Sequence, residues 1–121
     1  TLLILSSNSA YAEWVWIGNR EQGGTYVDPD TIRRNGNLVK MWELYDYETA
    51  FTLDRDSVFS IKAQIEYGCS EERSRVLTAF FYSGNMGRGK VVYSDSLESE
   101  WHPVEPGSIN EGLWKVACAK K

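Results

Sequence analysis

The glycine-rich stretch from Gly84 to Gly89, followed by Lys90, is the first segment whose spacing could carry out chemistry. A phosphate-binding P-loop has similar glycines after a strand, and a Ser or Thr after the lysine reaches Mg²⁺ as a helix begins. Here Val91 takes that position, and residues 91–93 are β-branched or aromatic, which favours a returning strand. The segment therefore predicts a β-hairpin without a nucleotide site.

Other residues that could support catalysis or bind metal do not form the set that such chemistry requires. His102, the only histidine, stands beside Trp101 in an expected loop, and general acid–base catalysis needs an orienting partner as well. Two Asp-x-Asp pairs begin at Asp28 and Asp54, but they flank turns and lack the further ligands of a calcium loop. We therefore expect no catalytic residue, no metal site and no cofactor, and we do not expect an enzyme.

The amino-terminal residues indicate export. The aliphatic residues 2–5 are followed by small polar residues and by Ala10-Tyr11-Ala12, which has the A-x-A pattern of a cleavage site. We interpret residues 1–12 as the end of a signal peptide and residues 13–121 as a single domain, located in the periplasm, secreted or associated with the cell surface. The alternative is that residues 2–5 form a buried first strand. No stretch approaches the roughly 20 apolar residues that span a bilayer.

The two cysteines, Cys69 and Cys118, fit the same interpretation. An even number of cysteines in an exported chain suggests a disulfide, because the space outside the cytoplasm is oxidising. Closing a loop of about 50 residues would stabilise the fold by up to about 4 kcal/mol. Zinc binding explains these residues less well, because two cysteines and one histidine far apart in the sequence do not make a clustered set of ligands.

The charged residues favour a protein partner. The net charge of −4 does not favour binding to nucleic acid or to an anionic membrane unless there is a local basic patch. Arginine is suited to carboxylates and to protein interfaces. The residues that we expect to contact a partner lie near predicted turns: Arg33, Arg34, Arg73, Arg75, Arg88 and Trp101. The alternative is that Arg73 and Arg75 pair with carboxylates at Glu71, Glu72 or a neighbouring strand.

Sequence patterns predict strands over most of the chain. Apolar residues take every second position from Phe59 to Cys69, so one face of that strand should be buried. Because Pro29 fixes φ and has no N–H, residues 28–33 are expected to form a helical turn. Turns are expected at Gly23-Gly24 and at Asn35-Gly36. The expected strands span residues 13–18, 25–27, 38–47, 58–69, 73–82 and 90–94.

The last element changes to helical periodicity. Ser108 and Glu111 have the spacing of a capping box after Pro106-Gly107. The residues that share one face of the expected helix are Ile109, Leu113, Val116 and Ala117. The predicted fold class is α+β, mainly β: an antiparallel meander of about six strands with one C-terminal helix packed on it. A bond between the two cysteines would fasten the edge of that helix to the sheet.

Several segments, taken together, have the sequence pattern of a known protein family. They are residues 26–29, 32–42, 72–75 and 82–87, Trp101, and residues 106–108. Together they resemble the surface-adhesin protein E family of Gram-negative bacteria. The resemblance implies an exported antiparallel sheet with a C-terminal helix, no known reaction, and adhesion to an extracellular-matrix or envelope protein. No lipobox cysteine precedes Glu13, so we expect a soluble protein without a lipid anchor.

Two hypotheses about function follow. The first is a non-enzymatic binding module that holds a protein partner through exposed arginine and aromatic residues, with homodimer formation left open. The second is a small-ligand carrier or an unrecognised enzyme with its site near Trp101 and His102. A polar-lined pocket that contains His102 would favour the second hypothesis, and a flat or dimeric surface would favour the first.

Overall fold

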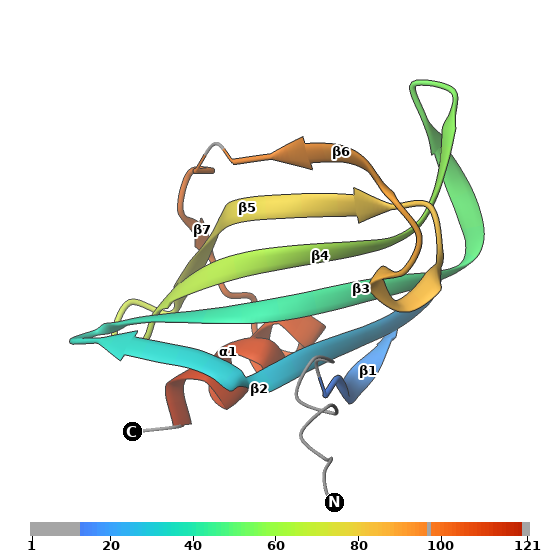
Figure 1. Ribbon diagram of the computed structural model, residues 1–121. Coiled ribbons are helices and arrows are strands. Elements are labelled where there is room, and N and C mark those ends of the chain that lie inside the picture. Colours follow the sequence, from blue (N-terminus) through green and yellow to red (C-terminus); the bar gives the residue numbers. More distant parts are fainter. Residues whose placement is uncertain (1–12, 97, 120–121) are drawn as a thin grey trace, which may run out of the picture.

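The computed structural model describes residues 13–96 and 98–119, so the signal peptide expected at residues 1–12 lies outside the described part of the chain. Strands β1–β6 follow one another as an antiparallel meander in one sheet, which α1 covers on one face (Figure 1). This confirms the predicted fold class. The elements are β1 (Val15–Arg20), β2 (Gly23–Asn35), β3 (Leu38–Leu53), β4 (Asp56–Gly68), β5 (Arg73–Tyr82), the 3₁₀ turn η2 (Asn85–Gly87), β6 (Val91–Asp95), β7 (His102–Pro103) and α1 (Ile109–Ala119).

Strand β5 has two short partners along its outer edge. Its second half pairs with β6, whereas its first two residues, Arg73 and Ser74, pair with Pro103 and His102 of β7. The chain therefore returns along β5 after β6, before it turns under the sheet to form α1 (Figure 1). This return brings the segment around residues 101–104 beside the start of β5.

The prediction of a helical turn at residues 28–33 is wrong. These residues belong to β2, with an irregularity in its pairing to β3. The backbone N–H of Asp30 donates to the Asp28 carboxylate at 3.2 Å. The Thr31 hydroxyl donates to the Asp28 carbonyl at 2.6 Å and accepts a bond from the Trp42 N–H at 3.0 Å. These side-chain hydrogen bonds compensate for ladder bonds that are lost around the proline, so the strand continues.

The turns are close to the positions that the sequence suggests. The first hairpin turns at residues 21–22, and Gly23 and Gly24 already belong to β2, so the turn expected at those glycines is displaced. Gly36 has a φ of 65° in the predicted β2–β3 turn. Strands β3 and β4 extend further than predicted and meet at Asp54 and Arg55, whose φ values of 51° and 76° suit a two-residue hairpin turn.

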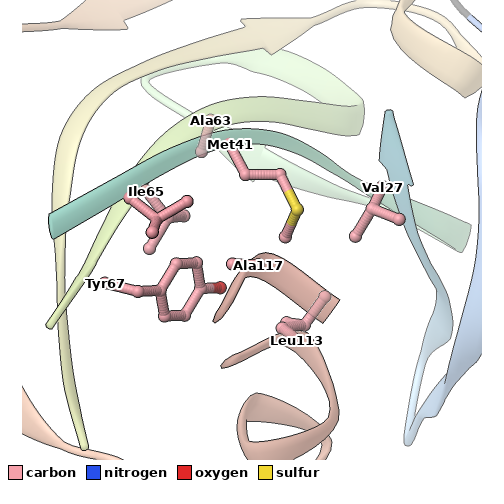
Figure 2. Close-up of a cluster of buried hydrophobic side chains, with 8 residues drawn as sticks. Val27, Met41, Ala63, Ile65, Tyr67, Leu113 and Ala117 are labelled. Atoms are coloured by element: carbon pink, nitrogen blue, oxygen red, sulfur yellow. The ribbon is translucent and has the colours of Figure 1, made fainter. Parts of the chain in front are cut away.

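The core lies between α1 and the sheet, as Figure 2 shows. Alternation in β4 places Ala63, Ile65 and Tyr67 on the covered face, which confirms that part of the predicted pattern. Leu113 and Ala117 of α1 are fully buried against them. We call the face that carries this core the inner face of the sheet and the opposite face the outer face.

The start and the end of α1 are both fixed by specific contacts. The Ser108 hydroxyl accepts a bond from the Glu111 N–H at 3.2 Å, and the Glu111 carboxylate accepts one from the Gly107 N–H at 3.0 Å. The predicted capping pair is thus confirmed, with the carboxylate reaching one residue further back than in a standard capping box. At the other end, Cys118 forms a disulfide with Cys69 across a Cα–Cα distance of 5.7 Å.

Candidate functional site

A row of charged residues crosses the outer face of the sheet. Because Met41 and its alternate neighbours point into the core, Lys40 points outward. Arg33 lies opposite Lys40, Lys40 lies opposite Glu66, and Glu66 lies opposite Arg75. Opposite residues in an antiparallel sheet share a face, so β2 to β5 present three cations and one carboxylate in line.

Trp101 covers the end of this row. The guanidinium carbon of Arg73 lies 4.3 Å from the centroid of the Trp101 ring, and that of Arg75 lies 4.6 Å from it. Both distances are typical of cation–π contact. Nε of Arg73 is buried and has no hydrogen-bond partner among the described residues. The return of the chain along β5 therefore brings Trp101 against Arg73 and Arg75, which lie far from it in the sequence.

Arg75 is also tied to carboxylates, as the alternative interpretation of the arginines expected. Its Nε and Nη2 atoms donate to the same Glu66 oxygen at 3.0 and 2.8 Å, and Nη1 lies 3.3 Å from Glu98. Glu66 is buried beneath this pair. Glu71 instead accepts a bond from the Asn37 amide at 2.6 Å. Arg75 thus fixes the centre of the row, whereas Arg73 forms no ion pair within the described chain.

A lysine and aromatic rings extend this surface. The Lys62 ammonium lies 5.5 Å from the centroid of the Trp42 ring and 5.8 Å from that of Tyr82. The Trp42 ring stacks on Phe80 at 6.1 Å. We call the five cations of this face, together with Trp101, the outer basic surface. It consists of Arg33, Lys40, Lys62, Arg73, Arg75 and Trp101.

The outer basic surface contains four of the six residues predicted to contact a partner. Arg34 is not among them, because it points to the inner side, where its Nη1 atom donates to the Cys118 carbonyl at 3.5 Å. Arg88 follows η2 at the opposite end of the sheet. Sequence reasoning missed Lys40 and Lys62, although each stands between apolar residues of a strand and must therefore face away from the core.

The second hypothesis placed a site near His102, and no cavity found among residues 13–96 and 98–119 contains it. His102 is exposed in β7, opposite Ser74, and the cavities described here are lined by residues other than His102 and Trp101. Within residues 13–96 and 98–119, no three metal-ligating side chains of His, Cys, Asp or Glu lie together. No helix in that same part of the chain is long and apolar enough to cross a membrane.

The glycine-rich segment is a hairpin loop, and the strand predicted after Lys90 is confirmed as β6. Its donors bind side chains of the protein itself. The Met86 N–H and the Asn85 amide donate to the Asp46 carboxylate at 2.7 and 3.1 Å. The Gly87 N–H donates to the Ser60 hydroxyl at 2.9 Å. These donors of the loop are thus already bonded to a carboxylate and a hydroxyl of neighbouring strands, which agrees with the prediction of a hairpin.

We expect Ser60→Ala to lower the free energy of unfolding by about 1 to 2 kcal/mol. The Ser60 hydroxyl is fully buried, donates to the Gly84 carbonyl at 2.6 Å and accepts from the Gly87 N–H. Alanine would leave both backbone groups of the loop without this partner. Urea unfolding measures the change, and exposed Ser57 in the same strand gives the matched control, Ser57→Ala. Equal effects of the two substitutions would contradict the prediction.

A buried carboxyl lies on the inner face and was not predicted. Glu43 is fully buried and accepts hydrogen bonds from the Tyr45 hydroxyl at 2.6 Å and from the Tyr67 hydroxyl. Burial raises the pKa of Glu43 to about 7, although the two tyrosine hydroxyls and nearby Arg20 act in the opposite direction. The signal was present, because Glu43 occupies the same alternating positions of β3 as buried Met41.

The fold is shared with solved structures of one bacterial protein. The selenomethionine form of Haemophilus influenzae protein E has a TM-score of 0.68 at 12% identity, covering 87% of this chain and 86% of that chain. Protein E from non-typeable Haemophilus influenzae has a TM-score of 0.61 at 12% identity, covering 90% and 77%. At these identities the likeness concerns the fold alone. No curated protein matches the sequence significantly.

An antiparallel meander covered on one face by a disulfide-linked C-terminal helix defines the fold class of this chain. The sequence signature described as surface-adhesin protein E matches residues 14–119. The chain therefore belongs to the surface-adhesin protein E family, as the resemblance of its segments predicted.

Proposed function

We propose that this protein is an exported, non-enzymatic binding module that holds an acidic region of a protein partner on the outer basic surface. The observation that carries the proposal is the distribution of charge. The chain has a net charge of −4, yet one face of its sheet gathers five cations. Glu66 and Glu98 lie among these cations, and both are paired with Arg75, so neither repels an acidic partner as a free carboxylate would.

The composition of the surface supports a protein partner. Arginine and tryptophan are enriched among the residues that contribute most to protein interfaces. Trp101 holds the guanidinium groups of Arg73 and Arg75 in fixed positions, which lowers the entropy lost when a partner binds. Membership of an adhesin family supports the same proposal, with extracellular-matrix or envelope proteins as partners.

Export is supported by the disulfide between Cys69 and Cys118, because such bonds persist in oxidising compartments. Cleavage after Ala12 would then give a mature chain that begins at Glu13. The location that we propose is the periplasm or the outside of the cell.

The double substitution Arg33→Gln and Lys40→Gln tests the proposed surface. Both side chains are exposed, and Lys40 forms no ion pair with a described residue. Arg33 donates to the carbonyls of Asp30 and Ile32 in its own strand, so the thermal midpoint of the variant is compared with that of the unchanged protein. The partner used is the purified matrix or envelope protein that binds the unchanged protein most tightly. We expect the association rate constant of the double variant with this partner to be about tenfold lower at low salt. Surface plasmon resonance against a panel of purified matrix proteins and native envelope proteins measures this change.

Arg88→Gln together with Arg55→Gln is the matched control, because it removes two exposed cations away from the outer basic surface. This control should bind as the unchanged protein does. Equal losses in both double variants would indicate an effect of net charge alone and would contradict the proposed surface. Full binding by the Arg33→Gln and Lys40→Gln variant would also contradict it.

A further inference from the structure

Part of the inner face lies beyond the core that α1 covers. The helix packs against β1 to β4, and β5 and β6 lie farther from it (Figure 1). One row of residues crosses the sheet just outside the core: Thr25 lies opposite Tyr45, Tyr45 opposite Ile61, Ile61 opposite Phe81, and Phe81 opposite Tyr93. These side chains share the inner face, so an aromatic and aliphatic row continues from the helix toward β6.

Two hollows lie along this row, and both are lined by Tyr45. The first has a volume of about 420 Å³ and is bounded by Arg20, Tyr47 and the start of β2. The second has a volume of about 340 Å³ and is lined mainly by apolar side chains. Those that the argument uses are Ile61, Ala63, Ile65, Val76, Ala79 and Phe81. Each volume lies in the range of sites for small ligands. Because Tyr45 lines both hollows, they adjoin at its ring, and we call the two together the trough, with a polar and an apolar part.

The close approach of β2 to β3 helps to shape the first hollow. A side chain at Gly23 would bring its Cβ atom to 1.8 Å from the Asp46 carbonyl oxygen. No residue other than glycine fits at this position without a shift of the backbone. Gly23 lines the first hollow together with Arg20 and Tyr47, so this close approach of the two strands forms part of its boundary.

Arg20 is held in place but is not neutralised. Its guanidinium carbon lies 5.0 Å from the centroid of the Tyr45 ring, and its Nε atom donates to the buried Thr25 hydroxyl at 3.1 Å. No carboxylate of the described chain lies within ion-pair distance of Arg20. The two terminal nitrogen atoms of the guanidinium group can therefore donate side by side to a ligand carboxylate.

The acidic residues around the trough form no ion pair with Arg20 in the described chain. Buried Glu43 is close enough for Arg20 to lower its pKa, but burial raises that pKa to about 7, so near neutral pH this carboxyl carries only part of a negative charge. Asp46 lines the first hollow, but its carboxylate accepts bonds from η2 on the outer face. Glu21 is exposed in the β1–β2 turn. Asp95 lies on β6 opposite Ala79 and lines the apolar hollow, away from the hollow that contains Arg20. A ligand with its negative charge at Arg20 and its apolar part away from it is complementary to this arrangement.

We propose that the trough binds an amphipathic carboxylate, a single aliphatic chain that ends in one carboxylate group. The carboxylate is held by Arg20, the chain crosses the ring of Tyr45, and its end is buried among Ile61, Val76 and Phe81. This binding activity is independent of the outer basic surface, which lies on the opposite face of the sheet.

The test uses sodium laurate as the probe, titrated into the purified protein by isothermal calorimetry below the concentration at which laurate forms micelles. We expect saturable binding at one site. Arg20→Gln should weaken laurate binding at least tenfold, because it removes a charge-assisted pair of hydrogen bonds. Arg20→Lys keeps the charge without the paired geometry and should weaken binding less. Arg33→Gln, which removes a cation from the outer face, should leave laurate binding unchanged.

A second ligand and a second variant separate the two parts of the trough. Dodecyltrimethylammonium has a chain of the same length with the opposite charge, and it should bind at least tenfold more weakly than laurate. Ala79→Phe, which fills the apolar hollow, should weaken laurate binding while Arg20 is intact. The thermal midpoint of each variant shows whether it is folded. No saturable laurate binding, equal binding by Arg20→Gln, or equal binding of the two ligands would overturn the proposal.

Discussion

The free energy of unfolding should fall by about 3 kcal/mol as the pH rises from 4.5 to about 7, and Glu43→Gln should remove most of this dependence. Burial raises the pKa of Glu43 from 4.5 to about 7, since the ionised carboxylate is poorly solvated beneath α1. Between these values the folded protein keeps a proton that the unfolded chain has lost. Raising the pH therefore favours unfolding, and the stabilisation is complete below pH 4.5 and lost by about pH 7.

Glutamine is a suitable replacement because it is neutral at every pH and has nearly the same shape. Its carbonyl can accept from one tyrosine hydroxyl while its amide donates to the other, so the hydrogen bonds with Tyr45 and Tyr67 are retained. Urea unfolding at pH 5, 6, 7 and 8 measures the effect. Glu48→Gln, an exposed position of the same strand, serves as the control and should keep the original pH dependence. An unchanged slope in Glu43→Gln would contradict the assignment.

Cys118→Ser should lower the free energy of unfolding by about 2 to 4 kcal/mol, because the loop closed by the disulfide spans 49 positions of the sequence. The loss of stability should be largest in α1. Cys118 is near the end of α1, where the other contacts include the burial of Ala117, a bond from Arg34 to the Cys118 carbonyl at 3.5 Å, and a bond from the Trp114 indole to the Gly68 carbonyl at 3.3 Å. Without the disulfide, the helix is the element that opens most easily.

Hydrogen exchange followed by mass spectrometry tests this order of opening. Exchange should rise first in residues 109–119 and much less in β3 and β4, which form the centre of the sheet. The double variant Cys69→Ser and Cys118→Ser should behave like the single variant, because both lack the same bond. A uniform rise in exchange across the sheet, or free thiols in the protein recovered from its native compartment, would contradict the prediction.

Local signals in the sequence were sufficient for most of the fold. Strand β5 begins and ends at the predicted residues, Arg73 and Tyr82, since a turn rich in polar residues precedes it and glycines follow it. The helix was predicted from its cap and its periodicity, which depend on neighbours within four positions. The continuation of β2 through Pro29 was missed, because the compensating bond from Trp42 comes from the next strand.

The candidate site depended more on contacts between distant residues. Arg73 and Trp101 are 28 positions apart, and only the pairing of β7 with β5 brings them together. Two-residue strands such as β7 carry no periodicity that a sequence can reveal. The sequence could have predicted that the side chains of Arg33 and Arg34 lie on opposite faces of the sheet, because neighbouring residues of a strand point to opposite faces.

The pairing of β6 and β7 with the outer edge of β5 affects the solubility of the protein. Residues 76–81 of this strand read Val-Leu-Thr-Ala-Phe-Phe, an uncharged segment of the kind that stacks into aggregates when its edge is open. β6 pairs with positions 79–82 and β7 with positions 73–74, while the Val76 carbonyl accepts a bond from the Ser99 N–H at 2.9 Å. Strand addition from a second molecule is thereby blocked along the most aggregation-prone segment, and the shorter strands β1 and β6 become the edges of the sheet.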